Sequence, residues 1–306
     1  MSFDPLALLR RQLPTVRQRY EARDTILYAL GVGAGHGTDA WDERHLRFFY
    51  EARLQALPTM CAMLGDAGFW MRDADSGLDW ARLVHAEEDM QWPGVLPPRG
   101  DVTGHNRIAS VEDRGPGRGA LFVVERELVD SASGQTLARS RTSVLARGNG
   151  GFAGGDPARQ RLGAAAPPPL PPWPARPADR VVRRATATHQ PLLYRLSADP
   201  NPLHVDPAVA RHAGFERPIM HGMCTFGLLG LLIVQEFCGF EAARLQALRA
   251  RFTAPLYPGE TLDCEFWRDA DEVRFRATCV ERGAVVLDLG RAQIGDRPAP
   301  SPGATA

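Results

Sequence analysis

The segment Tyr194-Arg-Leu-Ser-Ala-Asp-Pro-Asn-Pro-Leu-His204 puts a carboxylate, Asp199, and an imidazole, His204, five residues apart. Pro200 and Pro202 lie between them, and each proline favours an extended backbone in the residue before it. The segment is therefore predicted to be a rigid loop that presents both side chains in fixed geometry. A carboxylate and an imidazole held together can act as a general acid and base, for example to add water to an activated double bond or to remove it.

A buried helix is predicted after this loop. Residues 221–237 are apolar almost all round, which is typical of a helix enclosed by the rest of the protein. Gly222 stands at the start of this run and Gly239 follows its end. The backbone N–H groups at the helix start should lie near Asp199 and His204, where they would stabilise a developing oxyanion.

The rest of the second half alternates in the manner of strands, which are predicted over residues 245–252, 261–267, 272–280 and 284–290. A long buried helix followed by an antiparallel meander indicates a sheet wrapped around a helix. The first half repeats this order more weakly, with a helical segment over residues 43–64 and strands over residues 83–88, 103–112, 120–129 and 137–146. Two α+β halves in the same order suggest a duplicated unit.

Glycine and proline mark the boundary between the halves. Residues 150–155 are rich in glycine and residues 167–174 are nearly all proline, a composition that favours a semi-rigid, extended linker. The predicted division is an N-terminal domain over residues 1–150, a linker over 151–180, a C-terminal domain over 181–296 and a disordered tail over 297–306.

The composition argues against several classes of function. The 306 residues carry no formal net charge, so nothing indicates a nucleic-acid or membrane-surface partner. The longest apolar run, residues 226–234, is far short of the ~20 residues that cross a bilayer, and the N-terminal residues lack a signal-peptide pattern. The five cysteines form no C-x-x-C pair and are expected to be buried free thiols. We therefore expect a cytoplasmic protein.

The loop and the helix start resemble the hydratase 2 motif of the MaoC-like dehydratases, the family of the (R)-specific 2-enoyl-CoA hydratases. Ala198 stands where that family usually has glycine. Similar stretches upstream, at residues 24–35, 48–51, 57–59 and 147–152, extend the resemblance to roughly residues 20–295. The matching motif residues are Tyr194, Leu196, Ser197, Asp199, Asn201, Pro202, Leu203, His204, Asp206, Pro207, Ala213, Gly214, Phe215, Pro218, Ile219, His221, Gly222, Cys224 and Gly227.

This resemblance implies a double hot-dog fold of the α+β class, in which two antiparallel sheets each wrap around a central helix. It also implies the addition of water to trans-2-enoyl-CoA, giving (R)-3-hydroxyacyl-CoA without a cofactor. We expect a homodimer, with an N-terminal half that is catalytically silent and accommodates the acyl chain. The apolar segment over residues 57–69 could line the pocket for that chain. The expected catalytic residues are Asp199 and His204, with Asn201 orienting His204 or the water. The expected substrate-binding residues are Gly222 as the oxyanion donor, together with His221, Tyr194 and Glu51.

Each of these residues also has a purely structural interpretation. Asp199 and Asn201 could be turn residues before proline, and His204 a buried hydrogen-bonded side chain. Gly222 could serve close helix packing, Tyr194 could be a strand core residue and Glu51 a helix-surface charge.

The sequence also leaves room for different functions. The same chemistry on an acyl-carrier-protein thioester would make the chain a dehydratase of fatty-acid or polyketide synthesis. The motif is compatible as well with a non-catalytic acyl-CoA-binding module and with a hot-dog thioesterase. The run Gly31-Val-Gly-Ala-Gly35 does not fit the spacing G-x-G-x-x-G, which disfavours a dinucleotide site. The histidines form no recognised metal-ligand spacing, so no metal is expected.

Overall fold

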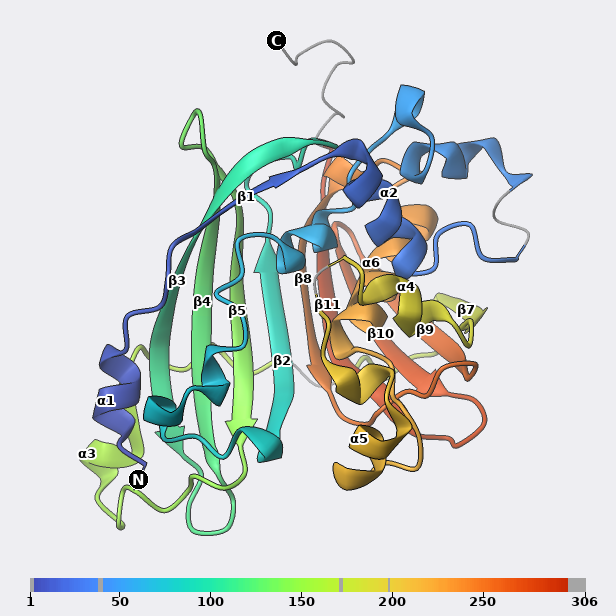
Figure 1. The fold of residues 1–306 in the computed structure, drawn as a ribbon. Helices are drawn as coiled ribbons and strands as arrows, with labels where there is room; N and C mark the ends of the chain where they lie inside the picture. Colours follow the sequence, from blue (N-terminus) through green and yellow to red (C-terminus); the bar gives the residue numbers. More distant parts are fainter. Residues whose placement is uncertain (1–2, 38–40, 171–172, 198, 297–306) are drawn as a thin grey trace.

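A single antiparallel sheet runs through both halves of the chain. The computed structural model describes residues 3–37, 41–170, 173–197 and 199–296, so Ala198 and the tail predicted over 297–306 lie outside the described residues. The eleven strands follow the order β1-β3-β4-β5-β2-β8-β11-β10-β9-β7, with β6 paired to β3 (Figure 1). The N-terminal strands are β1 Val16–Tyr20, β2 Leu83–Gln91, β3 Gly100–Asp113, β4 Ala120–Asp130, β5 Thr136–Ala146 and β6 Arg161–Gly163. The C-terminal strands are β7 Arg180–Ala185, β8 Leu245–Phe252, β9 Thr261–Asp269, β10 Glu272–Cys279 and β11 Val285–Ile294.

The two halves meet edge to edge where β2 pairs with β8. Their register runs from Glu87 opposite Arg251 to Gln91 opposite Ala247. Across this seam Glu87 forms an ion pair with Arg249 at 2.6 Å, and both side chains are mostly buried. The two predicted sheets are therefore joined into one continuous sheet, and the predicted α+β class is confirmed. Every strand predicted from alternation is present, and β11 continues beyond its predicted end to Ile294.

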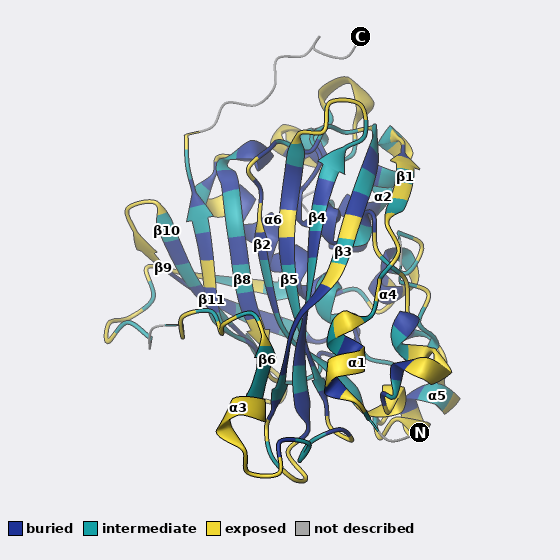
Figure 2. Cartoon of the chain, turned by 90° about the vertical axis from the view of Figure 1, so that its left-hand side faces the viewer, coloured by how far each residue is buried: buried dark blue, intermediate teal, exposed yellow. Residues whose placement is uncertain are grey.

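The strands show why alternation was a reliable signal. In β10, for example, the core takes every second side chain, namely Val273, Phe275, Ala277 and Cys279, while the residues between them are half-buried. One face of the sheet thus packs on the core and the other faces outward (Figure 2).

The predicted buried helix is α6, Gly222–Phe237, and it lies between the C-terminal strands and α2, Ala22–Gly31 (Figure 1). Two glycines let elements of the N-terminal half approach it closely. A Cβ atom on Gly227 would lie 2.6 Å from Val32 Cγ1, and one on Gly230 would lie 2.7 Å from Thr59 Cγ2. The N-terminal half therefore covers the helix of the C-terminal half, and the two share one hydrophobic core.

The helix predicted over residues 43–64 is wrong. The chain there forms three short 3-10 turns, Glu43–Phe48, Glu51–Arg53 and Pro58–Met63. Pro58 disfavours helical geometry in Leu57, which is extended, so no continuous helix can pass this point. Among the described residues, the N-terminal half thus lacks a central helix matching α6, and α2 packs onto α6 instead.

Several elements were not predicted from the sequence, namely β1, β6, β7, α2 and the short helices α1 Pro5–Arg10, α3 Pro157–Gln160 and α4 Gln190–Tyr194. The glycine run after α2 has a structural explanation. Gly33 and Gly35 have positive φ values of 99° and 73° and terminate the helix. A dinucleotide site needs its glycines before a helix, so this run does not form one.

The segment predicted as a linker is better anchored than its composition suggests. It contributes α3 and β6, and β6 pairs with β3 through Gly163 opposite Ser110. Further on, the carbonyl of Pro168 accepts a hydrogen bond from Arg249, and Trp173 packs on Trp267 with ring centroids 5.3 Å apart. Residues 171 and 172 lie outside the described residues.

We expect the halves to remain associated after the linker is cut. A protease site placed between Ala165 and Ala166, which are both exposed, should be cleaved readily. The pairing of β2 with β8 and the packing of α2 on α6 should then keep both pieces together. Size-exclusion chromatography of cut and uncut protein under native conditions is the measurement. Elution of two separate pieces would contradict the shared core.

Candidate active site

The loop that carries Asp199 is held by its own hydrogen bonds. The Asp199 carboxylate accepts from the backbone N–H of Asn201 at 3.2 Å. The Asn201 side-chain oxygen in turn accepts from the N–H of Leu203 at 3.1 Å, which caps the 3-10 turn Pro202–His204. Asn201 therefore has the turn role expected from its structural interpretation, and its proposed role in orienting His204 or water stays a prediction.

Asp199 and His204 meet a second histidine, His221, which lies just before the first residue of α6. A carboxylate oxygen of Asp199 and one nitrogen from each ring all lie within 4.8 Å of one another. The two imidazole rings are stacked, with centroids 3.7 Å apart and planes inclined by 31°. Only 7% of His204 and 1% of His221 is exposed, whereas Asp199 is half-buried, so the two rings are shielded from solvent and the carboxylate stays partly accessible.

Backbone carbonyls determine where the protons of the two histidines lie. His204 Nδ1 donates to the carbonyl of Ile219 at 2.8 Å, and His221 Nε2 donates to the carbonyl of Asp199 at 3.1 Å. Burial lowers the pKa of His204, and burial together with the neighbouring His204 lowers the pKa of His221 to about 3. At neutral pH both rings are therefore uncharged. His204 then presents an unprotonated Nε2, as a general base requires, while His221 holds the backbone of Asp199.

The same three side chains offer one carboxylate and two imidazole ligands, a donor set that metal ions such as zinc use in proteins. The prediction that no metal binds stays a prediction.

Tyr194 lies at the end of α4, so it is a helical residue and not part of a strand. Its ring is fully buried and packs on His221 with centroids 4.8 Å apart. Its hydroxyl donates to Met63 Sδ at 3.2 Å. Burial raises the pKa of Tyr194 well above its ordinary value, which keeps the hydroxyl neutral. The structure thus brings Tyr194 to the cluster, where its apolar ring and its neutral hydroxyl form one wall.

Gly222 is the first residue of α6. A Cβ atom at this position would lie 3.2 Å from the ring of Phe252 on β8, so a side chain would have to displace that ring. This geometry is compatible with both interpretations of Gly222. The helix start is close-packed, as a packing role requires, and its first N–H groups have no partner within the helix, as an oxyanion donor requires.

Glu51 is not brought to the cluster. It lies exposed in the 3-10 turn Glu51–Arg53, and it is not among the acidic residues grouped with His204 and His221. Its role in substrate binding stays a prediction that the geometry does not support.

A cavity of about 210 Å³ adjoins the loop and was only partly predicted. Its lining is mixed. The apolar side chains include Tyr20, Tyr28, Met60, Met63 and Leu64, and the polar ones are Gln18, Arg19, Asp24 and Ser197, which lies two residues before Asp199. The sequence indicated a pocket over residues 57–69, and three of these residues do line the cavity. Tyr20 and Tyr28 could not be predicted to line the cavity, because they belong to β1 and α2, two elements that were not predicted.

We predict that His221 makes the protein less stable in mild acid. Its folded pKa of about 3 lies below the ordinary value near 6.5, so between these values the unfolded chain binds the additional proton. Stability should therefore fall as the pH drops from 6.5 towards 3, by up to about 4 kcal/mol from this residue. Urea unfolding at pH 7, 5 and 4 should show a shallower loss for His221→Phe than for the wild type.

The exposed His212 on α5, Pro207–His212, supplies the control, because His212→Gln should leave the pH dependence unchanged. An identical loss of stability in His221→Phe and the wild type would show that His221 is not the group that titrates.

Comparisons with known proteins agree across the chain. Residues 18–148 match the MFE-2 hydratase 2 N-terminal domain, and residues 171–288 match the MaoC like domain. The chain is 33% identical to the peroxisomal enoyl-CoA hydratase 2 of Arabidopsis thaliana over 93% of this chain and 94% of that protein. It is 34% identical to the peroxisomal multifunctional enzyme type 2 of Mus musculus over 90% of this chain, and spans only 36% of that longer protein.

Among solved structures, the chain is similar to a MaoC-like dehydratase from Phytophthora capsici, with a TM-score of 0.80 and 28% identity. That similarity covers 95% of this chain and 99% of the other. In the part of the chain that the structure describes, every helix is too short or too polar to cross a bilayer.

Proposed function

Since the chain belongs to the MaoC-like dehydratases, in the branch built from a hydratase 2 N-terminal domain and a MaoC-like domain, we propose that it adds water reversibly to trans-2-enoyl-CoA and forms (R)-3-hydroxyacyl-CoA. The observation that carries this proposal is the cluster of the half-buried Asp199 and the buried His204 beside the start of α6. It joins a carboxylate and a neutral imidazole to backbone N–H groups, which are the parts that this reaction needs.

In the proposed mechanism, Asp199 and His204 Nε2 hold one water molecule. This water loses a proton to the pair as its oxygen bonds to C3 of the enoyl thioester. The electrons of the C2–C3 double bond move towards the thioester carbonyl, whose oxygen becomes negative. The N–H of Gly222, at the positive end of α6, donates to this oxygen. The captured proton then bonds to C2, and dehydration follows the same steps in reverse.

Simple observations separate this proposal from three different functions. An acyl-carrier-protein dehydratase would prefer carrier-protein thioesters to CoA thioesters. A binding module would bind acyl-CoA without turnover. A thioesterase would release free thiol, which a thiol reagent detects.

The test uses crotonyl-CoA and a longer trans-2-enoyl-CoA. We expect loss of the conjugated absorbance with both substrates, without release of free thiol, and a 3-hydroxyacyl-CoA product of the (R) configuration. Absence of turnover with both CoA and carrier-protein thioesters, in folded protein, would overturn the proposal. The described residues contain one such cluster, which predicts that a substrate analogue binds one to one. The homodimer and the cytoplasmic location stay predictions, tested by size analysis and fractionation.

A further inference from the structure

A second carboxylate, Glu88 on β2, is buried at the seam between the two halves and has an oxygen without a partner. Only 1% of the residue is exposed. Its Oε2 accepts from the Thr142 hydroxyl at 2.8 Å and from His85 Nε2 at 3.0 Å. Its Oε1 is also buried, yet it has no hydrogen-bond partner among the described residues. A buried carboxylate oxygen without a donor is costly, so this atom needs a partner that the described residues do not supply.

Glu88 faces the candidate active site. It lies opposite Thr142 on β5 and Ala250 on β8, on the face that packs inward. His85, which holds it, packs against Phe252 with ring centroids 4.5 Å apart and planes inclined by 49°. Phe252 is the ring that covers Gly222 at the start of α6. Contacts between neighbouring residues therefore connect Gly222, the proposed oxyanion donor, to Glu88 through Phe252 and His85.

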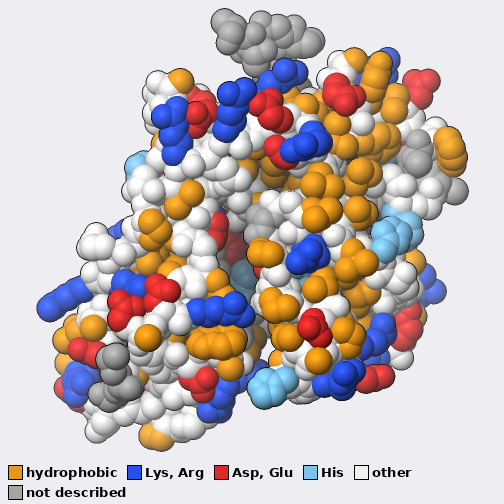
Figure 3. Space-filling model, viewed as in Figure 1, with side chains coloured by type: hydrophobic (Ala, Val, Ile, Leu, Met, Phe, Trp, Pro, Cys, Tyr) orange, Lys and Arg blue, Asp and Glu red, His pale blue; other side chains and the backbone are white. Residues whose placement is uncertain are grey.

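Tyr194 gives an independent indication of this proximity. Burial is the main cause of the raised pKa of Tyr194, and the charges of Asp199 and Glu88 add to it, so both carboxylates lie within electrostatic range of this ring. The surface between the two halves is hollowed, with acidic and histidine side chains deep in the hollow (Figure 3). Glu88 and Asp199, which come from opposite halves of the chain, therefore both act on Tyr194.

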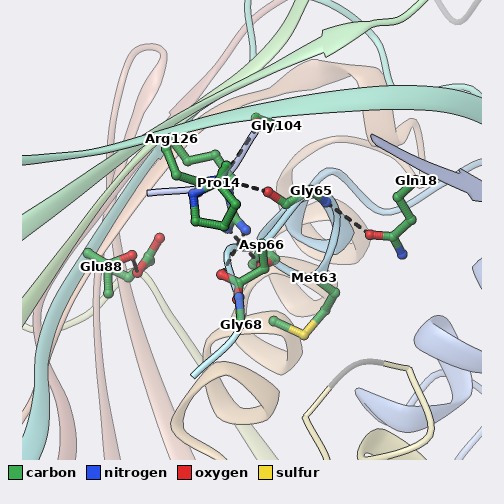
Figure 4. A network of polar contacts seen from close by, with 12 residues as sticks. Pro14, Gln18, Met63, Gly65, Asp66, Gly68, Glu88, Gly104 and Arg126 are labelled. Carbon is green, nitrogen blue, oxygen red and sulfur yellow. Dashed lines mark hydrogen bonds and ion pairs between the residues drawn. The ribbon is translucent and has the colours of Figure 1, made fainter. Parts of the chain in front are cut away.

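The surroundings of Glu88 are polar on the side of the N-terminal half. Arg126, which is 8% exposed, donates to Asp66 at 3.0 Å and to the carbonyl of Ala62 at 2.8 Å. In Figure 4 the Glu88 carboxylate is directed towards Arg126 and Asp66, and neither a hydrogen bond nor an ion pair joins Glu88 to these two residues. An alkyl chain has no donor for Glu88 Oε1, so a purely hydrocarbon occupant would leave this oxygen unsatisfied.

We propose that Glu88, held by His85 and Thr142, accepts a hydrogen bond from an O–H or N–H group of the thioester substrate and is a specificity-determining residue. This inference rests on the proposed function. The donor has two sources: a hydroxyl group on the acyl chain, or an amide or hydroxyl of the pantetheine arm. Both meet the same oxygen with the same chemistry, and the substrates below distinguish them.

The experiment compares wild type, Glu88→Leu and Glu88→Gln. The control is Glu127→Gln, which makes the same change of charge on β4 at a half-exposed carboxylate that pairs with Arg139. Three substrates are used: trans-2-decenoyl-CoA, trans-2-decenoyl-CoA with a hydroxyl group on the distal chain, and trans-2-decenoyl N-acetylcysteamine, which lacks most of the pantetheine arm. The readout is kcat/KM for each substrate, with the thermal midpoint of each variant as the measure of folding.

Loss of a hydrogen bond to a charged acceptor should lower kcat/KM by about tenfold or more. A loss in Glu88→Leu confined to the hydroxylated substrate identifies the acyl hydroxyl as the donor. An equal loss for both CoA substrates, with the N-acetylcysteamine substrate unaffected, identifies the pantetheine arm. Glu88→Gln, which keeps a neutral acceptor, should show a smaller loss in the same pattern, and it carries the test if Glu88→Leu fails to fold.

Values within about twofold of wild type for all three substrates would overturn this inference while leaving the proposed function intact. An equal loss for all three substrates would also overturn it, because it would indicate a structural role. A wild type that hydrates none of the thioesters would overturn the proposed function and this inference with it.

Discussion

Asp199→Asn and His204→Gln should each lower kcat by at least ~10²-fold, since general acid–base catalysis contributes 10²–10⁴. Asp199→Asn removes the negative charge beside His204 but keeps an oxygen that can accept from the N–H of Asn201, so the turn should persist. His204→Gln removes Nε2, the lone pair left free once Nδ1 has donated to Ile219. Both changes are nearly isosteric, so folding should be little affected. Steady-state rates with crotonyl-CoA give the measurement.

Asp206→Asn is the matched control. Asp206 belongs to the same segment and caps α5 by accepting from the N–H groups of Ala208 and Val209, a role that asparagine also fills. Its kcat should stay close to that of the wild type. Turnover near the wild-type value in either Asp199→Asn or His204→Gln, in folded protein, would show that the pair is not catalytic.

The second large effect concerns the cavity beside the loop. Met63→Trp should lower kcat/KM for long trans-2-enoyl-CoA substrates by about 10²-fold, and far less for crotonyl-CoA. Met63 lines the cavity, and a larger ring there would take the space of several methylene groups. Each buried methylene contributes about 0.8 kcal/mol, so the exclusion of about four reaches this magnitude. A four-carbon chain should not reach the cavity. The measurement is kcat/KM against chain length.

The structure determines which substitution makes this test meaningful. Ala62 and Gly65 belong to the segment predicted to line the pocket, but neither lines the cavity. A Cβ atom on Gly65 would lie 2.7 Å from Gly104 Cα, and Ala62 is a core residue whose carbonyl binds Arg126. Tryptophan at either position would disrupt the fold. Leu192→Trp, at an exposed position of α4, is a suitable control and should leave the chain-length profile unchanged. Equal losses at all lengths in Met63→Trp would show that Met63 acts as core.

Local patterns predicted the parts of the site that depend on a short stretch of chain. Asp199 and His204 could be found because prolines and an Asx turn fix their relation over six residues. The start of α6 could be predicted because an apolar run as long as residues 221–237 rarely forms anything other than a buried helix. His221 was predicted from the family resemblance and from its place before Gly222, and its hydrogen bond to the backbone carbonyl of Asp199 requires the folded loop.

Residues that meet through the tertiary fold could not be predicted in this way. Glu88 has the appearance of a strand-surface charge in a run of acidic residues, and only the pairing of β2 with both β5 and β8 buries it. Tyr194 contacts Met63 across 131 positions of sequence. The helix expected over residues 43–64 failed for a local reason as well, since Pro58 interrupts a segment whose apolar residues are buried by packing and not by helical periodicity.

The glycines of α6 have a thermodynamic consequence. Because Gly227 and Gly230 let Val32 and Thr59 press against the helix, the surface that each half would expose on its own is the surface that the other removes from water. Melting of either half would therefore leave the other with an uncovered apolar face, and a state with only one half folded is disfavoured. The chain should then behave in calorimetry as one cooperative unit, with equal calorimetric and van't Hoff enthalpies, although its sequence repeats a pattern that belongs to two domains.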